Sequence, residues 1–126
     1  MSELTPYLAV ADCRAAMSWY ADVLGATVTY EPIVMADGRV GHVEMSIDGA
    51  VFFMADAHPE IRATAPTGEG SPVTLHLTVT DVDALTRAAA DAGATVDRGP
   101  EDSPPVGRVA VFRDPFGHRW FLNQAL

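Results

Sequence analysis

The sequence contains no lysine, and its 8 arginines are outnumbered by 17 aspartates and glutamates, for a formal net charge of −9. Proteins that bind nucleic acid or anionic membranes need a basic surface to replace counterions or to meet lipid headgroups. We therefore expect no nucleic-acid partner and no membrane partner. An acidic chain gains solubility from its charge, and that charge also gives a weak preference for a cationic ligand.

Cysteine and long apolar runs are also scarce. Cys13 is the single cysteine, so no internal disulfide is expected. No stretch approaches the ~20 apolar residues that a membrane span needs, and no basic stretch leads into an apolar run like that of a signal peptide. These absences predict a cytoplasmic protein. Cys13 follows Asp12 and has no base beside it in the sequence, so we expect an unreactive thiol.

An internal repeat is present in a chain of 126 residues that is 48% hydrophobic. The segment Leu8–Asp12 matches Leu77–Asp81, and Gly25–Val28 matches Gly93–Val96. The matches predict one domain, 1–126, built from two copies of about 1–57 and 72–126. The residues between them, 58–71, are rich in Pro, Gly and Thr and are predicted to form a linker.

Each copy has the same pattern of predicted elements. A helix begins after Asp12 and ends at Gly25 in the first copy, and its counterpart lies between Asp81 and Gly93. The strands are predicted at Thr5–Val10, Thr27–Val34, Arg39–Ile47, Ala50–Met54, Pro72–Val79, Thr95–Asp97, Arg108–Arg113 and Arg119–Gln124. The fold class is therefore α+β, with two βαβββ units that form a curled mixed sheet around a cleft.

The turns between these strands carry their own signals. Asp37-Gly38 and Asp48-Gly49 are typical of hairpin turns in which both central residues have positive φ. The segment Asp114–Gly117 has Pro at its second position and Gly at its fourth, which fits a type I turn.

Alternation along the strands assigns side chains to two faces. Val43, Met45 and Ile47 are predicted to pack under a helix, as are Val73, Leu75, Leu77 and Val79, and Val109 and Val111. The opposite face then carries Tyr7, His42, Glu44, His76, Arg108 and Phe112. Such a mixed face lines a ligand cleft if the sheet curls, and otherwise it is an ordinary solvated sheet face.

The chain resembles the vicinal oxygen chelate superfamily of glyoxalases, bleomycin-resistance proteins and extradiol dioxygenases. The segments that carry the resemblance are Pro6–Asp12, Trp19–Ala26, His76–Asp83, Ala92–Ala94 and Arg113–Trp120. The resemblance covers nearly the whole chain, and its Asp-Pro-x-Gly turn with the repeat is typical of the superfamily rather than of one activity. It also implies a homodimer.

Metal-dependent members of that superfamily take one ligand early in the first strand of each unit and one in its last strand. Carried onto this sequence, these positions are about Thr5, Phe53, Thr74 and Phe121. Threonine is a poor ligand and phenylalanine is none, so we expect no metal and no other cofactor. The carry-over instead turns Phe53 and Phe121 toward the cleft, together with Val51, Arg119 and Asn123.

These expectations lead to a metal-independent small-molecule binding protein, with antibiotic sequestration or resistance as its role and a cationic aromatic ligand as its partner. The expected ligand-binding residues are Tyr7, His42, Glu44, Phe53, His76, Arg108, Phe112 and Phe121. The alternative is a glyoxalase-like lyase or isomerase that uses His42, Glu44 or His76 as acid and base, or as a displaced metal site. A third reading is a dimeric accessory protein with no ligand. The sequence assigns no catalytic residue.

Overall fold

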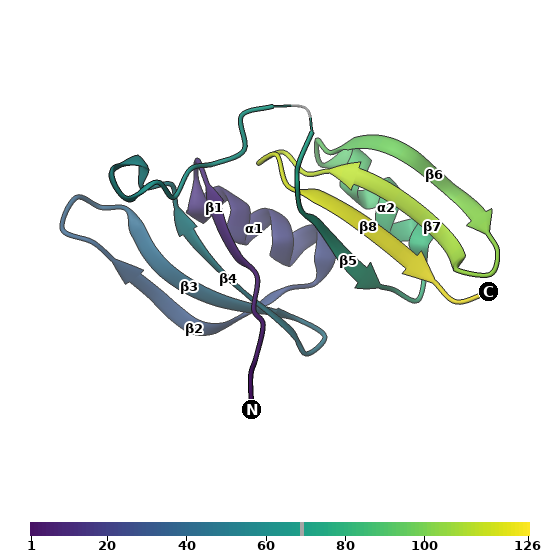
Figure 1. Cartoon of the computed structure of the whole chain (residues 1–126), viewed down its shortest axis with the longest axis horizontal. Helices are drawn as coiled ribbons and strands as arrows, with labels where there is room; N and C mark the ends of the chain where they lie inside the picture. Colours follow the sequence, from purple (N-terminus) through teal and green to yellow (C-terminus); the bar gives the residue numbers. More distant parts are fainter. Residues whose placement is uncertain (69) are drawn as a thin grey trace. The chain divides into compact units, whose positions relative to one another are not determined.

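The computed structural model describes residues 1–68 and 70–126 and divides the chain into two compact units, Met1–Pro66 and Thr67–Leu126. Each unit has the element order strand, helix and three strands (Figure 1). The first contains β1 (Tyr7–Val10), α1 (Cys13–Leu24), β2 (Thr27–Val34), β3 (Val40–Ile47) and β4 (Ala50–Asp56). The second contains β5 (Thr74–Thr78), α2 (Val82–Asp91), β6 (Thr95–Ser103), β7 (Gly107–Arg113) and β8 (Arg119–Gln124). The predicted α+β class and the two βαβββ units are confirmed.

The eight strands divide equally between two mixed sheets, one in each unit. The strand order is β1-β4-β3-β2 in the first sheet and β5-β8-β7-β6 in the second. In both sheets the first strand of the unit runs parallel to its last strand, and the other neighbours are antiparallel. The two copies of the sequence repeat therefore fold with the same topology.

Both helices begin at the aspartates that the sequence marks. The Asp12 carboxylate accepts a hydrogen bond from the N–H of Ala15 at 3.1 Å, and Asp81 accepts one from Ala84 at 3.0 Å. These bonds satisfy donors of the first turn that have no partner within the helix.

The two helices end differently. Gly25 caps α1 in the left-handed conformation with φ of 69°, as predicted. In α2 the C-cap is Ala92, and Gly93 follows it with φ of 100°. The second glycine therefore turns the chain one residue after the cap.

Each helix buries one face against its own sheet. The buried residues are Cys13, Ala16, Trp19, Tyr20 and Leu24 of α1 and Val82, Thr86 and Ala89 of α2. Thr86 is polar, and its hydroxyl donates to the Val82 carbonyl at 2.6 Å, so its burial leaves no unpaired hydroxyl proton. No helix in the described part of the chain has the length and apolarity that a membrane crossing requires.

The predicted alternation is confirmed in β3, where Val43, Met45 and Ile47 are buried under α1. In β5 the prediction holds in part. Leu77 is buried, but Val73 precedes the strand and is 65% exposed. Alternation along a strand predicted to begin at Pro72 placed Val73 in the core, whereas the strand begins at Thr74.

The orientation predicted for β7 is wrong, and this moves two expected ligand-binding residues. Phe112 pairs with Trp120 and is fully buried, and Arg108 pairs with Gln124, whose side chain accepts a hydrogen bond from the N–H of Val82 in α2. Arg108 and Phe112 therefore face α2. The prediction failed because all four residues from Val109 to Phe112 are buried, so the strand has no polar face to orient it.

The connections also differ in detail from the prediction. Asp48 and Gly49 both have positive φ, as expected for a tight hairpin, but of Asp37 and Gly38 only the glycine does. There the paired residues are Val34 and Val40, so the loop is longer than two residues. Strand β6 extends to Ser103 through two register shifts.

The predicted linker, 58–71, contains a short 3₁₀ helix, η1 (Pro59–Ile61). The compact units divide after Pro66, within this segment. Position 69 of the linker lies outside the described residues.

Candidate functional site

The first candidate site lies on the sheet face of the first unit that is opposite α1, which we call the unit-1 face. Strand register brings its side chains together, because Phe53 of β4 pairs with both Tyr7 of β1 and Glu44 of β3. His42 lies two residues before Glu44 on the same face of β3. Four predicted ligand-binding residues therefore lie in one cluster.

Tyr7, His42 and Glu44 form a hydrogen-bonded chain. The Tyr7 hydroxyl lies 2.7 Å from His42 Nδ1, and His42 Nε2 lies 2.9 Å from Glu44 Oε2. With Glu44 ionised, the Nε2–H of His42 donates to the carboxylate, and Nδ1 of a neutral ring accepts from the Tyr7 hydroxyl. The carboxylate thus orients the imidazole, and the phenol lies at the other end of the chain.

The Tyr7 hydroxyl keeps its proton at neutral pH. Its pKa is raised above the ordinary value of 10.0, first by partial burial and then by electrostatic interaction with Cys13 and with the Glu44 carboxylate. The same hydroxyl can also donate to the Gly41 carbonyl, which is 3.2 Å away. Tyr7 is therefore a proton donor with two acceptors in reach.

Aromatic rings surround this chain. The His42 ring centre lies 5.3 Å from that of Tyr7 and 5.0 Å from that of Phe53, in edge-to-face geometry. Tyr30 of β2 lies 6.3 Å from the same imidazole. Sequence reasoning missed Tyr30, because a register shift between Val28 and Tyr30 pairs it with Glu44 on this face, and no local pattern marks such a shift.

A pocket of about 390 Å³ adjoins the cluster within the first unit. Its lining residues are Glu3, Leu4, Thr5, Glu44, Gly49, Val51 and Phe53. Two of these are carboxylates, and among the described residues that line the pocket none is basic. The pocket therefore combines an aromatic wall with negative charge.

The corresponding face of the second unit, opposite α2, is the unit-2 face. Register pairs Thr74 with Arg119 and His76 with Phe121 across β5 and β8. The His76 and Phe121 rings are stacked, with centres 5.4 Å apart and planes inclined by 18°. The prediction placed both rings on this face, and the structure confirms that orientation.

The positions where the resemblance places metal ligands do not fit a metal ion. Phe53 and Phe121 have no donor atom, and the Thr74 hydroxyl accepts a hydrogen bond from Arg119. In the displaced set, His42 and Glu44 bond to each other, and His76 of the second unit stacks on Phe121. Within residues 1–68 and 70–126, no group of three or more His, Cys, Asp or Glu could hold a metal ion.

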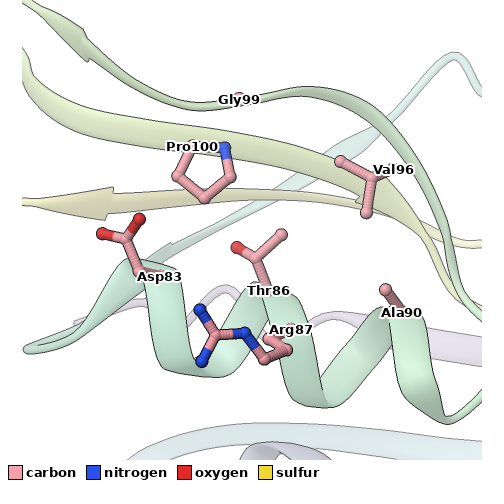
Figure 2. A pocket seen from close by; sticks show the side chains of 7 residues that line it. All are labelled: Asp83, Thr86, Arg87, Ala90, Val96, Gly99 and Pro100. Carbon is pink, nitrogen blue, oxygen red and sulfur yellow. The ribbon is translucent and has the colours of Figure 1, made fainter.

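A second pocket, of about 230 Å³, lies between α2 and β6 (Figure 2). Asp83, Thr86, Arg87 and Ala90 line it from the helix, and Val96, Gly99 and Pro100 line it from the strand. Its main polar groups are already engaged. Asp83 accepts two hydrogen bonds from Arg108, at 2.7 and 2.9 Å, and the Thr86 hydroxyl donates within the helix.

Arg108 has a structural role in this arrangement. It also forms an ion pair with Asp102 at 3.0 Å, so its guanidinium joins α2 to β6. The hydrogen bond from Arg108 holds the pKa of the Asp83 carboxyl below its ordinary value. Arg108 is therefore committed to two carboxylates on the helix side of its sheet.

Comparison with known proteins gives consistent results. The family model for the Glyoxalase/Bleomycin resistance protein/Dioxygenase superfamily matches residues 4–122. The uncharacterised protein Mb0911c of Mycobacterium bovis is 39% identical over 125 residues, which is 96% of this chain and 82% of that protein. Anthracycline biosynthesis protein DauV of a Streptomyces species is 32% identical over 114 residues, and the match spans 84% of this chain and 40% of DauV.

Solved structures agree with the fold. The chain superposes on TnmS3, an antibiotic binding protein from Streptomyces sp. CB03234, with a TM-score of 0.69 and 27% identity, covering 100% of this chain and 98% of that one. The repeat, the two βαβββ units and the family match over nearly the whole sequence lead to one assignment. The chain belongs to the glyoxalase/bleomycin resistance protein/dioxygenase superfamily.

Proposed function

We propose that the protein is a metal-independent small-molecule binding protein that sequesters an aromatic, antibiotic-like compound. The observation that carries this proposal is the ring cluster of Tyr7, His42 and Phe53 beside the pocket of the first unit. His76 and Phe121 offer a second aromatic surface on the unit-2 face. Arg108 and Phe112 are not part of the proposed site, because both face α2.

The composition of the pocket supports a flat, apolar ligand. Its aromatic wall, Phe53, is held edge-to-face against Tyr7 with ring centres 5.7 Å apart, so its orientation is fixed before a ligand arrives. Aromatic contacts contribute about 1 kcal/mol each beyond the burial of apolar area. A volume of about 390 Å³ is within the range of pockets that hold drug-sized ligands.

The charge of the pocket supports a cationic group on that ligand. Glu44 has 30% of its side chain exposed, and Glu3 lies at the same pocket. A ligand ammonium would meet negative charge from both carboxylates and the electron-rich face of an aromatic ring. The similarity to an antibiotic binding protein and to an anthracycline biosynthesis protein agrees with this ligand class.

Thermal-shift screening against bleomycin-type glycopeptides, anthracyclines and neutral aromatic antibiotics tests the proposal. We expect a cationic aromatic compound to raise the melting temperature of the metal-stripped protein. The variant Phe53→Leu should lose most of that shift, and Glu44→Gln should weaken cationic compounds more than neutral ones.

Val106→Ala is the matched control, because Val106 is exposed in the β6–β7 connection and should leave the shift unchanged. The proposal fails if small metabolites raise the melting temperature and no aromatic antibiotic does. Metal analysis of the untagged protein is the companion test, since stoichiometric Ni, Zn, Mn or Fe would contradict metal independence.

The chain of Tyr7, His42 and Glu44 favours a second candidate, a lyase or isomerase that works by proton transfer. A carboxylate that orients an imidazole beside a protonated phenol supplies a base and an acid on one sheet face. Hydrogen bonds join His42 to Glu44 and to Tyr7, so the candidate rests on His42 and Glu44, with Tyr7 as the proton donor.

Proton exchange in D₂O tests this candidate. Carbonyl compounds with acidic α-protons should exchange those protons faster in the presence of the wild-type protein, as read by ¹H NMR. Glu44→Gln should abolish the acceleration and leave the circular dichroism spectrum unchanged. An exchange rate that is the same for both proteins would remove Glu44 from such a mechanism.

We also propose that the protein is a cytoplasmic homodimer, as the superfamily membership suggests. Light scattering coupled to size exclusion should then give a mass twice the 13.4 kDa of one chain. A mass equal to one chain at micromolar concentration would contradict the dimer.

A further inference from the structure

The strongest unassigned feature is Arg119 on the unit-2 face. Its guanidinium donates to the Thr74 hydroxyl, and this is a bond to a neutral group. Four other arginines, at positions 39, 98, 108 and 113, form ion pairs with carboxylates. Among the described residues, no carboxylate lies within ion-pair distance of Arg119, although the chain has 17 acidic residues.

A second arginine lies beside Arg119 on the unit-2 face. Arg113 of β7 lies directly opposite Arg119 in the β7–β8 register, so both side chains emerge on the same face. The Asp97 carboxylate lies near Arg119 and accepts two hydrogen bonds from Arg113, at 2.8 and 3.1 Å. Asp97 therefore bonds to Arg113 and interacts with Arg119 through charge alone, without a hydrogen bond to it.

Strand register places an aromatic surface beside this charge. Thr74 and Arg119 form one cross-strand row, and His76 and Phe121 form the next row on the same face. Adjacent rows on one face are about 6.6 Å apart, because each residue advances the strand by about 3.3 Å. His76 is exposed, and Phe121 and Arg119 are half-buried, so both rows are accessible in part.

The two rows together fit a flat ring that carries an acidic group. A ring resting on the His76–Phe121 stack would extend a carboxylate over the preceding row. A guanidinium has five N–H donors in a planar fork that matches a carboxylate, and the bond to Thr74 uses one of them. The Thr74 bond also limits the rotamers of Arg119, which reduces the entropy cost of binding.

We infer that the unit-2 face binds an aromatic anion, with its ring on His76 and Phe121 and its carboxylate on Arg119. This inference rests on the proposed function, since it names the class of ligand group that the second aromatic surface takes. This preference differs from that of the first unit. The pocket there has two carboxylates, whereas the unit-2 face has an arginine that bonds to a neutral hydroxyl.

Three probes with the same ring and different charge test the inference: 2-naphthoate, 2-naphthamide and 2-naphthylmethylammonium. Titration of the full chain at pH 7, followed by NMR of the Arg119 side-chain N–H and the His76 ring, locates binding on the unit-2 face. We expect 2-naphthoate to bind this face at least tenfold more tightly than 2-naphthamide, because a charge-assisted bond replaces a neutral one.

Arg119→Gln should weaken 2-naphthoate about tenfold and leave 2-naphthamide unchanged. The affinity of Arg119→Lys for 2-naphthoate should fall between those of the wild-type protein and Arg119→Gln, because lysine keeps the charge and loses the planar fork of donors. Arg87→Gln is the matched control, since Arg87 lies on α2, on the other side of the same sheet, and should change neither affinity. Phe121→Leu should weaken both aromatic probes.

Equal affinity of the carboxylate and the amide, no effect of Arg119→Gln, or no binding of 2-naphthoate at millimolar concentration would each overturn the inference. These outcomes are separate from the failure of the proposed function. An antibiotic whose thermal shift depends on Phe53 would still support the proposed function if 2-naphthoate did not bind. Tighter binding of the ammonium probe at His76 and Phe121 would assign the opposite charge preference to this face.

Discussion

Cys13 is the first residue of α1, a position where the helix dipole ordinarily favours the thiolate form of a cysteine. Here burial outweighs the dipole. The side chain is fully buried, and the Asp56 carboxylate accepts the Cys13 backbone N–H at 2.7 Å and adds negative charge beside the sulfur. Burial first, and then Asp56, raise the pKa of the Cys13 thiol to about 12. The expectation of an unreactive cysteine thus has a physical cause in the fold.

We predict that Cys13 of the folded protein does not react with Ellman's reagent at pH 8. Because the folded thiol holds its proton more tightly than the unfolded one, stability should also fall as pH rises from about 9 toward 12. Absorbance at 412 nm measures the reaction, and the same protein in concentrated urea should release one thiolate per chain. A folded protein that reacts as fast as the unfolded one would contradict the buried, protonated thiol.

At the scale of elements, the turn between β7 and β8 depends on one aspartate. Asp114 accepts hydrogen bonds from the backbone N–H of Phe116 at 2.9 Å and of His118 at 3.0 Å, and from the Trp120 indole at 2.9 Å. The Gly117 N–H donates to the Asp114 carbonyl at 3.0 Å, which confirms the predicted type I turn. A single carboxylate therefore fixes both the turn and the first core residue of β8.

We predict that Asp114→Ala lowers the free energy of unfolding by about 3 kcal/mol, because it leaves three donors without their acceptor in a site that is 4% exposed. Asp114→Asn should cost less, since its amide oxygen still accepts. Urea unfolding followed by tryptophan fluorescence measures both. Asp48→Asn in the β3–β4 turn is the control, because asparagine tolerates the positive φ of that position. A loss for Asp114→Ala no larger than for this control would refute the role of the turn.

At the scale of the whole molecule, arginines pair with selected carboxylates in both units. Hydrogen bonds from Arg39 lower the pKa values of Asp37 and Glu60, and a hydrogen bond from Arg113 lowers that of Asp97. The remaining acidic residues outnumber the arginines, so the surface is negative at neutral pH. These pairs are exposed, and water and salt weaken each one.

We predict that stability falls as pH drops below about 4, the ordinary pKa range of carboxyl groups. A folded-state pKa below the unfolded value gives stability that is present above the unfolded pKa and is lost as pH falls through the folded one. Urea midpoints between pH 2.5 and 6 measure this slope. Arg39→Gln and Arg113→Gln should each reduce the dependence of the urea midpoint on pH. Arg62→Gln is the control and should not reduce it, because Arg62 forms no ion pair within the described residues. Identical slopes in all four proteins would show that these pairs do not contribute.

The sequence was sufficient for those features whose signals are local. The N-cap aspartates, the Asp48-Gly49 turn and the alternation of β3 each depend on residues a few positions apart, and the structure confirms them. It was insufficient where a strand is apolar on both faces. In β7 nothing local distinguishes the helix side from the other, and Phe112 was therefore placed on the wrong face.

The candidate site shows the same division. Alternation and the family resemblance were enough to place Tyr7, His42, Glu44 and Phe53 on one face of their strands. The hydrogen-bonded order of Tyr7, His42 and Glu44 depends on pairing of β1 with β4 and of β4 with β3, which are separated along the chain.

By itself, the sequence determined the repeat, the element order and the superfamily, because each of these follows from local pattern or from the resemblance. Tertiary structure alone decided which polar groups are already paired. Arg108 is committed to Asp83 and Asp102, whereas Arg119 donates to the Thr74 hydroxyl and forms no ion pair within the described residues, and the two arginines look alike in the sequence. Ion pairing depends on distance in space, and strand register and helix packing set that distance.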